Sequence, residues 1–304
     1  MLSQEQIQSY DDNGYILVEN AITPEQLSML RTRTLELIDE SRPVTESNDV
    51  FDLDEGHGPN NPRLTRIKLP HKVDPMFWDV IRSSAMTEVL RDLLGDNVTL
   101  QTSKLNTKAP GGGMAVEWHQ DWAFYPATND SMLAIGLMLE DVDLENGPLQ
   151  VIPGSHKGPV LSHMGPGGRF CGAVDPSDPD FDLDKAVTLT GKAGSMTVHH
   201  VRMLHGSAPN TSDRARLICF YECAAADAWP LAGGSSYIHK LTQEELWQDM
   251  QERMIFGEPT LTPRLEANPV RLCLPPAPTG GSIFKTQKTG GARSAFAKQP
   301  VAAE

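Results

Sequence analysis

Cysteine is scarce in this sequence, which contains only Cys171, Cys219, Cys223 and Cys273 among 304 residues. Only Cys219 and Cys223 lie close together, in an apolar stretch typical of a strand rather than in the turn that a structural zinc ion requires. We therefore predict four free thiols and no structural zinc.

The sequence also lacks an excess of positive charge and long apolar runs. Lysine and arginine number 26 against 40 acidic residues, which gives a formal net charge of −14. This balance offers no basic surface for nucleic acid or an anionic membrane. No apolar run reaches membrane-spanning length, and the opening MLSQEQIQSYDDNGY lacks the features of a signal peptide. We expect a cytoplasmic protein whose partners are small molecules.

The composition, with 39% hydrophobic and 22% charged residues, lies in the globular range. Thr23 followed by Pro24 predicts the start of a first long helix. A second helical region is predicted over residues 74–95, ending at Gly95. The part comprising residues 1–95 is therefore expected to be helical.

From Val98 onward the pattern changes to short apolar and β-branched runs divided by turn clusters, which predict strands at 98–106, 131–139, 148–152, 195–201 and 215–223. Long helices do not alternate with these runs, so we predict an antiparallel sandwich or barrel, mainly β with flanking α-helices. We expect one domain, with a β-rich core at 96–228 and a C-terminal extension at 229–304 that contains a helical piece at 242–257. The irregular segment 158–188 is typical of a functional loop.

The stretch WHQDW contains His119 and Asp121, two positions apart on a predicted strand, so both side chains should project from one face. Such a pair alone is common by chance. His205, in the run HHVRMLHGSAPNTSDRAR, follows an apolar strand and could complete a triad. Two imidazoles and one carboxylate on one face of an iron ion leave three positions open, as in non-haem iron(II) oxygenases.

Those open positions would accept dioxygen and the keto-acid end of 2-oxoglutarate, whose far carboxylate needs a guanidinium partner. Arg216, eleven residues after His205, is placed for that role. It opens a strand that we expect to pair beside the strand preceding His205. Arg214 lies in the turn and is expected to face solvent.

The motifs WHQDW, ENGPLQVIPGSHKG and HGSAPNTSDRAR occur in the order found in the phytanoyl-CoA dioxygenase family, which the chain resembles over roughly residues 5–225. The resemblance implies a double-stranded β-helix (a cupin-like jelly-roll). It also implies iron(II) on His119, Asp121 and His205, with the distal carboxylate of 2-oxoglutarate on Arg216.

The same resemblance places Asn106 in the cosubstrate pocket. Ser207 could bond the oxoglutarate carboxylate, although a turn-capping role is at least as well supported. Related halogenases carry a small residue in place of the aspartate, so the presence of Asp121 favours hydroxylation over halogenation.

The remaining histidines are weaker candidates for metal binding. His199 and His200 are adjacent, so on a strand they face opposite ways, and neither is expected to bind metal. His163 lies in the 158–188 loop and is a candidate substrate contact.

The segment RLTRIKLPH concentrates positive charge in an acidic chain. A solvated strand face is the simplest interpretation. The sharper hypothesis is that Arg66, together with Lys104 or Lys108, recognises an anionic group of the substrate.

These observations predict an iron(II)- and 2-oxoglutarate-dependent dioxygenase that hydroxylates an aliphatic carbon of a small metabolite and releases succinate and carbon dioxide. The same site could support desaturation, ring closure or epimerisation. A rival from another class is a catalytically silent cupin-like binding protein, which the presence of both Asp121 and Arg216 disfavours. The sequence selects neither an oligomeric state nor one substrate among amino acids and related solutes, phosphonates, acyl-CoA esters and alkaloid or polyketide intermediates.

Overall fold

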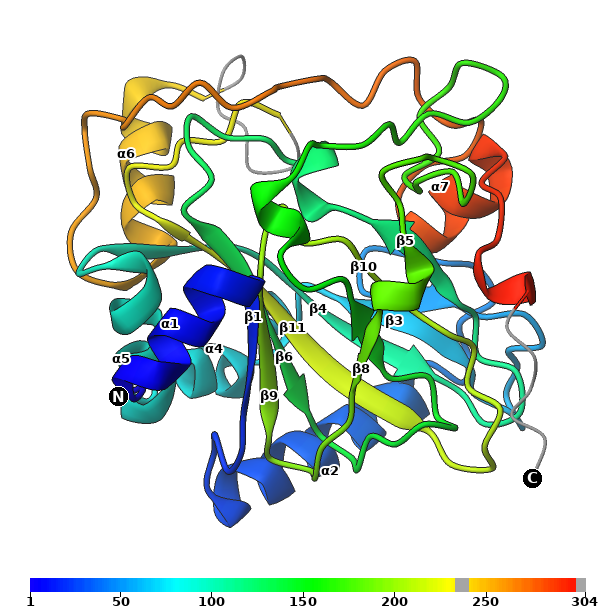
Figure 1. Cartoon of the computed structure of the whole chain (residues 1–304). Coiled ribbons are helices and arrows are strands. Elements are labelled where there is room, and N and C mark those ends of the chain that lie inside the picture. Colours follow the sequence, from blue (N-terminus) through cyan, green and yellow to red (C-terminus); the bar gives the residue numbers. More distant parts are fainter. Residues whose placement is uncertain (233–240, 299–304) are drawn as a thin grey trace.

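The computed structural model describes residues 1–232 and 241–298, which form two antiparallel sheets with helices around them (Figure 1). The larger sheet has the strand order β1 (Tyr15–Val18), β9 (Met196–His200), β6 (Met132–Met138), β11 (Arg216–Ala225), β4 (Val98–Lys108), β3 (Leu64–Lys68) and β2 (Phe51–Leu53), and β12 (Met254–Phe256) also pairs with β4. The smaller sheet has the order β5 (Val116–His119), β10 (His205–Ser207), β7 (Leu149–Val151) and β8 (Val187–Leu189). The fold is a double-stranded β-helix with flanking helices, as predicted.

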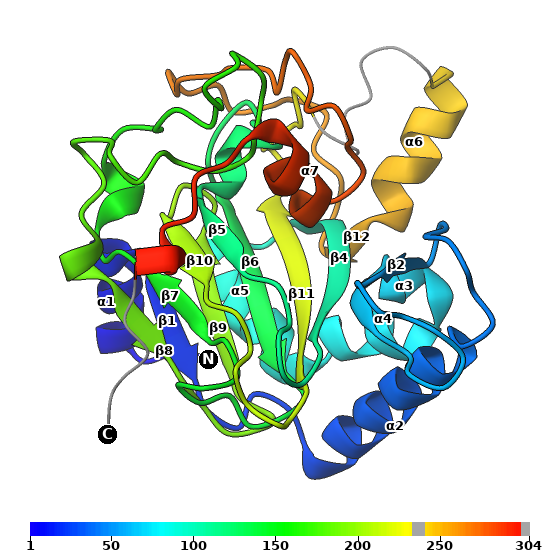
Figure 2. The same cartoon turned by 90° about the vertical axis from the view of Figure 1, so that its right-hand side faces the viewer.

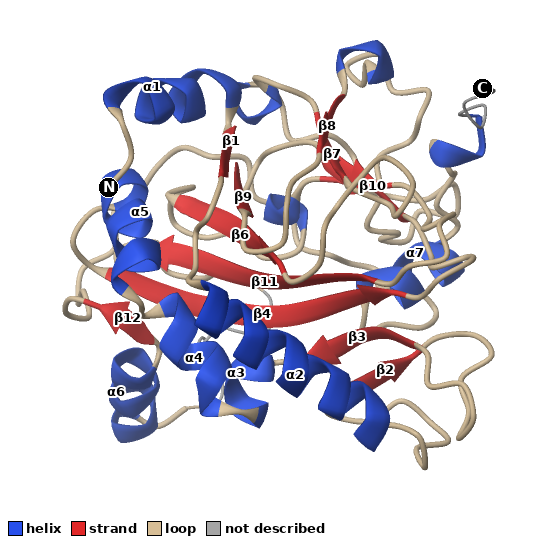
Figure 3. Ribbon diagram, turned by 90° about the horizontal axis from the view of Figure 1, so that it is seen from below, coloured by secondary structure: helices blue, strands red, loops and turns tan. Residues whose placement is uncertain are grey.

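Helices cover the outer face of the larger sheet (Figure 3). They are α1 (Gln4–Asn13), α2 (Pro24–Glu40), α3 (Pro70–Val73), α4 (Pro75–Ile81) and α5 (Ser84–Leu94). The predicted start of α2 is confirmed, because the Thr23 hydroxyl accepts a hydrogen bond from the backbone of Gln26 and the Gln26 side chain bonds back, forming a capping box. Apolar side chains of these helices and of the sheet form one continuous core.

The N-terminal third differs from the prediction in two ways. The expected helical region 74–95 is broken after Ile81, so that α4 and α5 are separate helices. The third also contributes β1, β2 and β3, which extend both edges of the larger sheet. Strands of three to five residues carry little periodic signal of their own, and their partners in the sheet supply the hydrogen bonds that stabilise them.

The order of the central strands also corrects an expectation. β11, which begins at Arg216, does not pair with β9, the strand preceding His205; β6 lies between them. β11 instead pairs with β4 along its whole length and sets Arg216 opposite Lys108. Pairing between strands so distant in sequence cannot be read from local pattern.

The C-terminal extension begins with α6 (Gln243–Glu252), and the predicted helical piece gives way to β12 after Arg253. An extended segment then crosses the molecule to α7 (Ile283–Gly290), which lies near β5 (Figure 2). Among the described residues no helix is both long and apolar enough to span a membrane. All four cysteines are free thiols.

Tyr221 joins the central sheet to the helical layer. Its side chain is fully buried on β11, and its hydroxyl donates a 2.8 Å hydrogen bond to the backbone carbonyl of Phe77 in α4. We expect Tyr221→Phe to lower the free energy of unfolding by about 1 kcal/mol, because the variant loses this buried hydrogen bond. Urea denaturation measures the loss, and a midpoint equal to that of the unaltered protein would contradict this account.

Candidate metal centre

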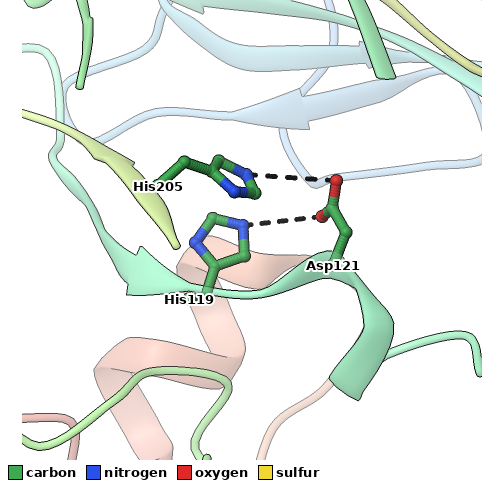
Figure 4. Close-up of side chains that lie close together, drawn as sticks. All are labelled: His119, Asp121 and His205. Atoms are coloured by element: carbon green, nitrogen blue, oxygen red, sulfur yellow. Dashed lines mark ion pairs between the residues drawn. The ribbon is translucent and has the colours of Figure 1, made fainter. Parts of the chain in front are cut away.

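Three buried side chains converge between the two sheets (Figure 4). β5 ends at His119 and β10 begins at His205, and these two residues are direct partners in the antiparallel pair. One ligand atom from each of His119, Asp121 and His205 lies within 4.8 Å of the others. The Asp121 carboxylate is 3.6 Å from Nε2 of His119 and 3.9 Å from Nε2 of His205.

The prediction that Asp121 lies on the same strand as His119 is wrong. Asp121 is the first residue of a short 3-10 helix, η1 (Asp121–Ala123). Gln120 before it keeps an extended backbone (φ −118°, ψ 128°), so strand-like alternation continues for one residue beyond the ladder. The carboxylate therefore still turns to the side of His119.

The hydrogen bonds of the two imidazoles select one tautomer. Nδ1 of His119 is 2.8 Å from the Glu117 carbonyl oxygen, and Nδ1 of His205 is 2.9 Å from the Met203 carbonyl oxygen. A carbonyl only accepts, so each Nδ1 carries the hydrogen and each Nε2 presents a lone pair toward Asp121.

Burial and neighbouring charges set the ionisation of the triad. Burial alone would raise the pKa of Asp121, but His205 and Lys104 outweigh it and hold that pKa well below its usual range. Burial, together with the neighbouring His119 and His199, lowers the pKa of His205 well below its usual value. An ionised carboxylate and a neutral His205 imidazole are the forms in which these two side chains bind a metal ion.

Gln120, between the two ligands of WHQDW, is fully buried and fixes the turn. Its Nε2 donates to the carbonyls of Pro159 (3.1 Å) and Arg202 (2.8 Å), and its Oε1 accepts from the Leu161 amide (2.8 Å).

His163 lies next to this turn, and its Nε2 accepts a 2.8 Å hydrogen bond from the backbone amide of Gln120. His163 also bonds the Leu161 carbonyl through Nδ1 at 2.9 Å, so both of its ring nitrogens have protein partners. Its predicted role toward substrate stays a prediction, because the structure places it behind the turn.

The two tryptophans of WHQDW hold the turn from opposite sides. Trp118 packs edge-on against Phe181 and stacks on Phe296. Trp122 is buried, and its indole Nε1 donates a 2.7 Å hydrogen bond to the carbonyl of Pro269 in the C-terminal extension. Both rings are therefore structural supports of the metal centre.

Arg216 faces the triad from the larger sheet. It is buried, its Nη1 donates to the Gly147 carbonyl at 2.9 Å, and its Nε has no partner among the described residues. Burial lowers its pKa to about 9, and no carboxylate of the described chain opposes that shift. A buried guanidinium without an acid partner costs stability, so the site is built to receive an anion. Gly147 is required here, because its φ is +79° and a Cβ would meet the Ala208 carbonyl oxygen at 2.5 Å.

Arg214 behaves as expected, with about half of its side chain exposed and an ion pair to Asp143. Asn106 and Ser207 both line the cavity close to Arg216. The buried Asn106 Oδ1 has no partner among the described residues, whereas the Ser207 hydroxyl accepts a 2.8 Å hydrogen bond from Nζ of Lys108. Ser207 lies in β10 rather than in a turn.

Farther along the inner face of the larger sheet lie Lys104, a predicted substrate contact, and Glu222, which the sequence analysis did not identify. Lys104 and Glu222 form a 3.0 Å ion pair beside Asp121. His199 also lines the cavity, with Nε2 3.8 Å from the Asp121 carboxylate and neither ring nitrogen hydrogen-bonded to the described chain. As predicted from alternation, His200 turns the other way and packs against other rings. Glu222 could have been found, because it is six residues after Arg216 and so lies on the same face of β11.

Arg66 is not among the residues that line the cavity; it lies on β3, beside the edge strand β2 of the larger sheet. Its Nε is 2.5 Å from the carboxylate of buried Asp52, and its Nη2 donates to the Gly281 carbonyl. Lys68 and Lys285 lie 3.3 and 3.8 Å from the same carboxylate. Two of the basic residues of RLTRIKLPH, Arg66 and Lys68, thus pair with one internal acid, and the proposed contact of Arg66 with substrate stays a prediction.

The donor set suits iron(II), because two neutral imidazoles and one carboxylate form a facial triad with open positions. The unpaired guanidinium across the cavity suits the far carboxylate of 2-oxoglutarate. Such a site inside a double-stranded β-helix is that of a non-haem iron oxygenase that consumes 2-oxoglutarate.

The chain belongs to the phytanoyl-CoA dioxygenase family, whose model matches residues 10–218. A probable alpha-ketoglutarate-dependent hypophosphite dioxygenase from Stutzerimonas stutzeri is 36% identical over 93% of this chain and 96% of its own. An ectoine dioxygenase from Bordetella bronchiseptica is 27% identical over 72% of this chain and 74% of its own. Iron-bound EctD from S. alaskensis shares the fold, with a TM-score of 0.63 and 24% identity over 76% of this chain and 80% of EctD. The protein is an iron- and 2-oxoglutarate-dependent dioxygenase.

The Lys104–Glu222 pair yields a pH-dependent prediction. Burial and then Asp121 raise the pKa of Glu222, and Lys104 partly offsets them. Lys104→Met would raise that pKa further. When a carboxyl has a higher pKa in the folded than in the unfolded protein, the protein becomes less stable as the pH rises from the unfolded-state pKa toward the folded-state pKa. The variant should therefore be nearly as stable as the unaltered protein at pH 5 and about 2 kcal/mol less stable at pH 8.

Urea denaturation at both pH values measures this difference. Lys157→Met removes the exposed partner of Asp12 and should change stability at neither pH. If Lys104→Met lowered the free energy of unfolding equally at pH 5 and pH 8, the pKa of Glu222 would not depend on Lys104.

Proposed function

We propose that His119, Asp121 and His205 hold iron(II) and that Arg216 binds the far carboxylate of 2-oxoglutarate, for hydroxylation of a small metabolite with release of succinate and carbon dioxide. The observation that carries this proposal is the convergence of three buried ligand atoms opposite a buried guanidinium that lacks an acid partner among the described residues. When bound, iron and 2-oxoglutarate supply the activation of dioxygen and the oxidation.

The chain's own residues bind, orient and exclude water. Arg216 would fix the orientation of the cosubstrate, and Asn106 and Ser207 offer polar atoms beside it. Lys108 donates to the Ser207 hydroxyl oxygen, which leaves the hydroxyl hydrogen free to donate to a carboxylate. Gln120 holds the turn between His119 and Asp121 in one geometry, which favours a fixed direction of attack.

The fold alone does not select hydroxylation. Neighbours of the same fold include the carbocyclase SnoK and the epimerase SnoN of nogalamycin chemistry. The presence of Asp121 among the ligands and the likeness to two proteins named dioxygenases support hydroxylation over those outcomes. The complete triad likewise argues against a silent binding protein.

We further propose that the substrate is small and polar. The cavity has an empty volume of about 440 Å³, part of it open to solvent. On the same sheet as Arg216, the side chains of Lys104, Glu222 and His199 supply both donors and an acceptor to the cavity, which suits a polar solute better than a long alkyl chain.

Hypophosphite oxidation is a second candidate, favoured by the relative that matches nearly the whole chain. Inserting one oxygen atom into a P–H bond of hypophosphite gives phosphite, and the other oxygen atom of dioxygen enters succinate. Lys104 and His199 could donate to the phosphinate oxygens.

The first experiment tests the metal and cosubstrate sites. Iron(II) and 2-oxoglutarate added without oxygen should give the weak visible charge-transfer band of the chelate. Asp121→Ala should abolish it, because the triad loses its only carboxylate. Arg216→Met should weaken 2-oxoglutarate binding roughly tenfold to a hundredfold, which corresponds to the loss of one hydrogen bond between charged groups. Arg214→Met is the matched control, and an equal loss in that variant, or a band in Asp121→Ala, would overturn the assignment.

A second experiment tests the substrate class. Succinate release is measured with hypophosphite and with ectoine as separate substrates, and phosphorus NMR follows any phosphite. We expect a small polar substrate to raise succinate release above the substrate-free rate. Phosphite equal in amount to succinate supports the second candidate. Stimulation by ectoine without phosphite formation from hypophosphite supports carbon hydroxylation.

A further inference from the structure

Gln287, on α7 of the C-terminal extension, bonds to the strand that carries His119. β5 lies at the edge of the smaller sheet, with β10 on one side. The Gln287 Oε1 accepts a 3.0 Å hydrogen bond from the Glu117 amide, and its Nε2 donates at 3.2 Å to the Glu117 carbonyl. The side-chain amide thus pairs with this edge residue as a neighbouring strand would.

The Glu117 carbonyl also accepts from His119. Nδ1 of His119 lies 2.8 Å from the same oxygen that receives Nε2 of Gln287. The partner of the non-ligating nitrogen fixes the tautomer and the ring direction of a metal-binding histidine. A group that fixes this carbonyl therefore acts on the direction of Nε2 of His119.

Further hydrogen bonds and close packing hold Gln287 and Glu117 in place. Gln287 is buried, and its Nε2 also donates a 2.9 Å hydrogen bond to the Gly172 carbonyl in the 158–188 loop. The Glu117 carboxylate in turn accepts from the Ala295 amide at 2.9 Å. α7 meets the loop so closely that a Cβ on Gly165 would lie 2.2 Å from the Gly290 carbonyl oxygen. α7 therefore has little room to shift.

We propose that Gln287 is a positioning residue of the metal centre, holding the Glu117 carbonyl so that His119 presents Nε2 toward Asp121 and His205. The C-terminal extension, beyond the residues 10–218 that match the family model, thereby completes the site. This inference rests on the proposed function, in which His119 is a ligand of iron.

Gln287→Met tests it, because methionine keeps the length and apolar contacts and removes the amide. We expect the dissociation constant for iron(II), titrated anaerobically, to rise about tenfold, the lower end of the effect of an outer-shell partner. The visible spectrum of the cobalt(II)-loaded protein should change as well, since it reports ligand geometry independently of turnover. Gln287→Glu keeps the acceptor for the Glu117 amide but sets an oxygen against two carbonyls, and should weaken binding at least as much.

Thr289→Val is the matched control on the same helix. Within the part of the chain that the structure describes, the Thr289 hydroxyl bonds only to Thr279 and Lys285, both in the C-terminal extension. This variant should bind iron(II) and cobalt(II) as the unaltered protein does. An equal loss in Thr289→Val would assign the effect to general loosening of α7 and overturn the proposal.

Two further outcomes separate the inference from the function on which it rests. Unaltered affinity and an unaltered cobalt(II) spectrum in Gln287→Met, with Asp121→Ala unable to bind metal, overturn the inference alone. Failure of the unaltered protein to bind either ion overturns both. If Gln287→Met does not fold, Gln287→Glu decides the question by the same measurements.

Discussion

The antiparallel pairing of β5 with β10 is the interaction on which the site depends. It sets His205 directly opposite His119, at the end of one strand and the beginning of the other. A shift of one residue in this register would turn one imidazole to the other face of the sheet. Gln120 and the carbonyls of Glu117 and Met203 then fix the turn and the two rings, so the triad geometry follows from backbone hydrogen bonds.

Stability and chemistry are assigned to opposite faces of the larger sheet. Its outer face packs against α2, α4 and α5 in a continuous apolar core. Its inner face carries Arg216 and the Lys104–Glu222 pair, whose burial costs stability. The apolar face offsets this cost. The inner face therefore keeps unpaired polar atoms that a cosubstrate and a substrate can satisfy.

Prediction from sequence succeeded where a signal was local. The cap at Thr23, the five core strands and the spacing of His119 and Asp121 all lie within short windows. Expectations failed where they depended on the partner of a strand. β11 was placed beside β9, although β6 lies between them.

The sequence by itself determined the class of fold and the chemical types of the residues that face the iron site, because strand periodicity and ligand chemistry are properties of short segments. Only the tertiary structure decided that Glu222 and His199 line the cavity, that His163 supports the turn from behind, and that Gln287 contacts the strand of His119. These contacts join segments far apart in sequence, and the packing of two sheets and a C-terminal helix sets them. No local pattern encodes that packing.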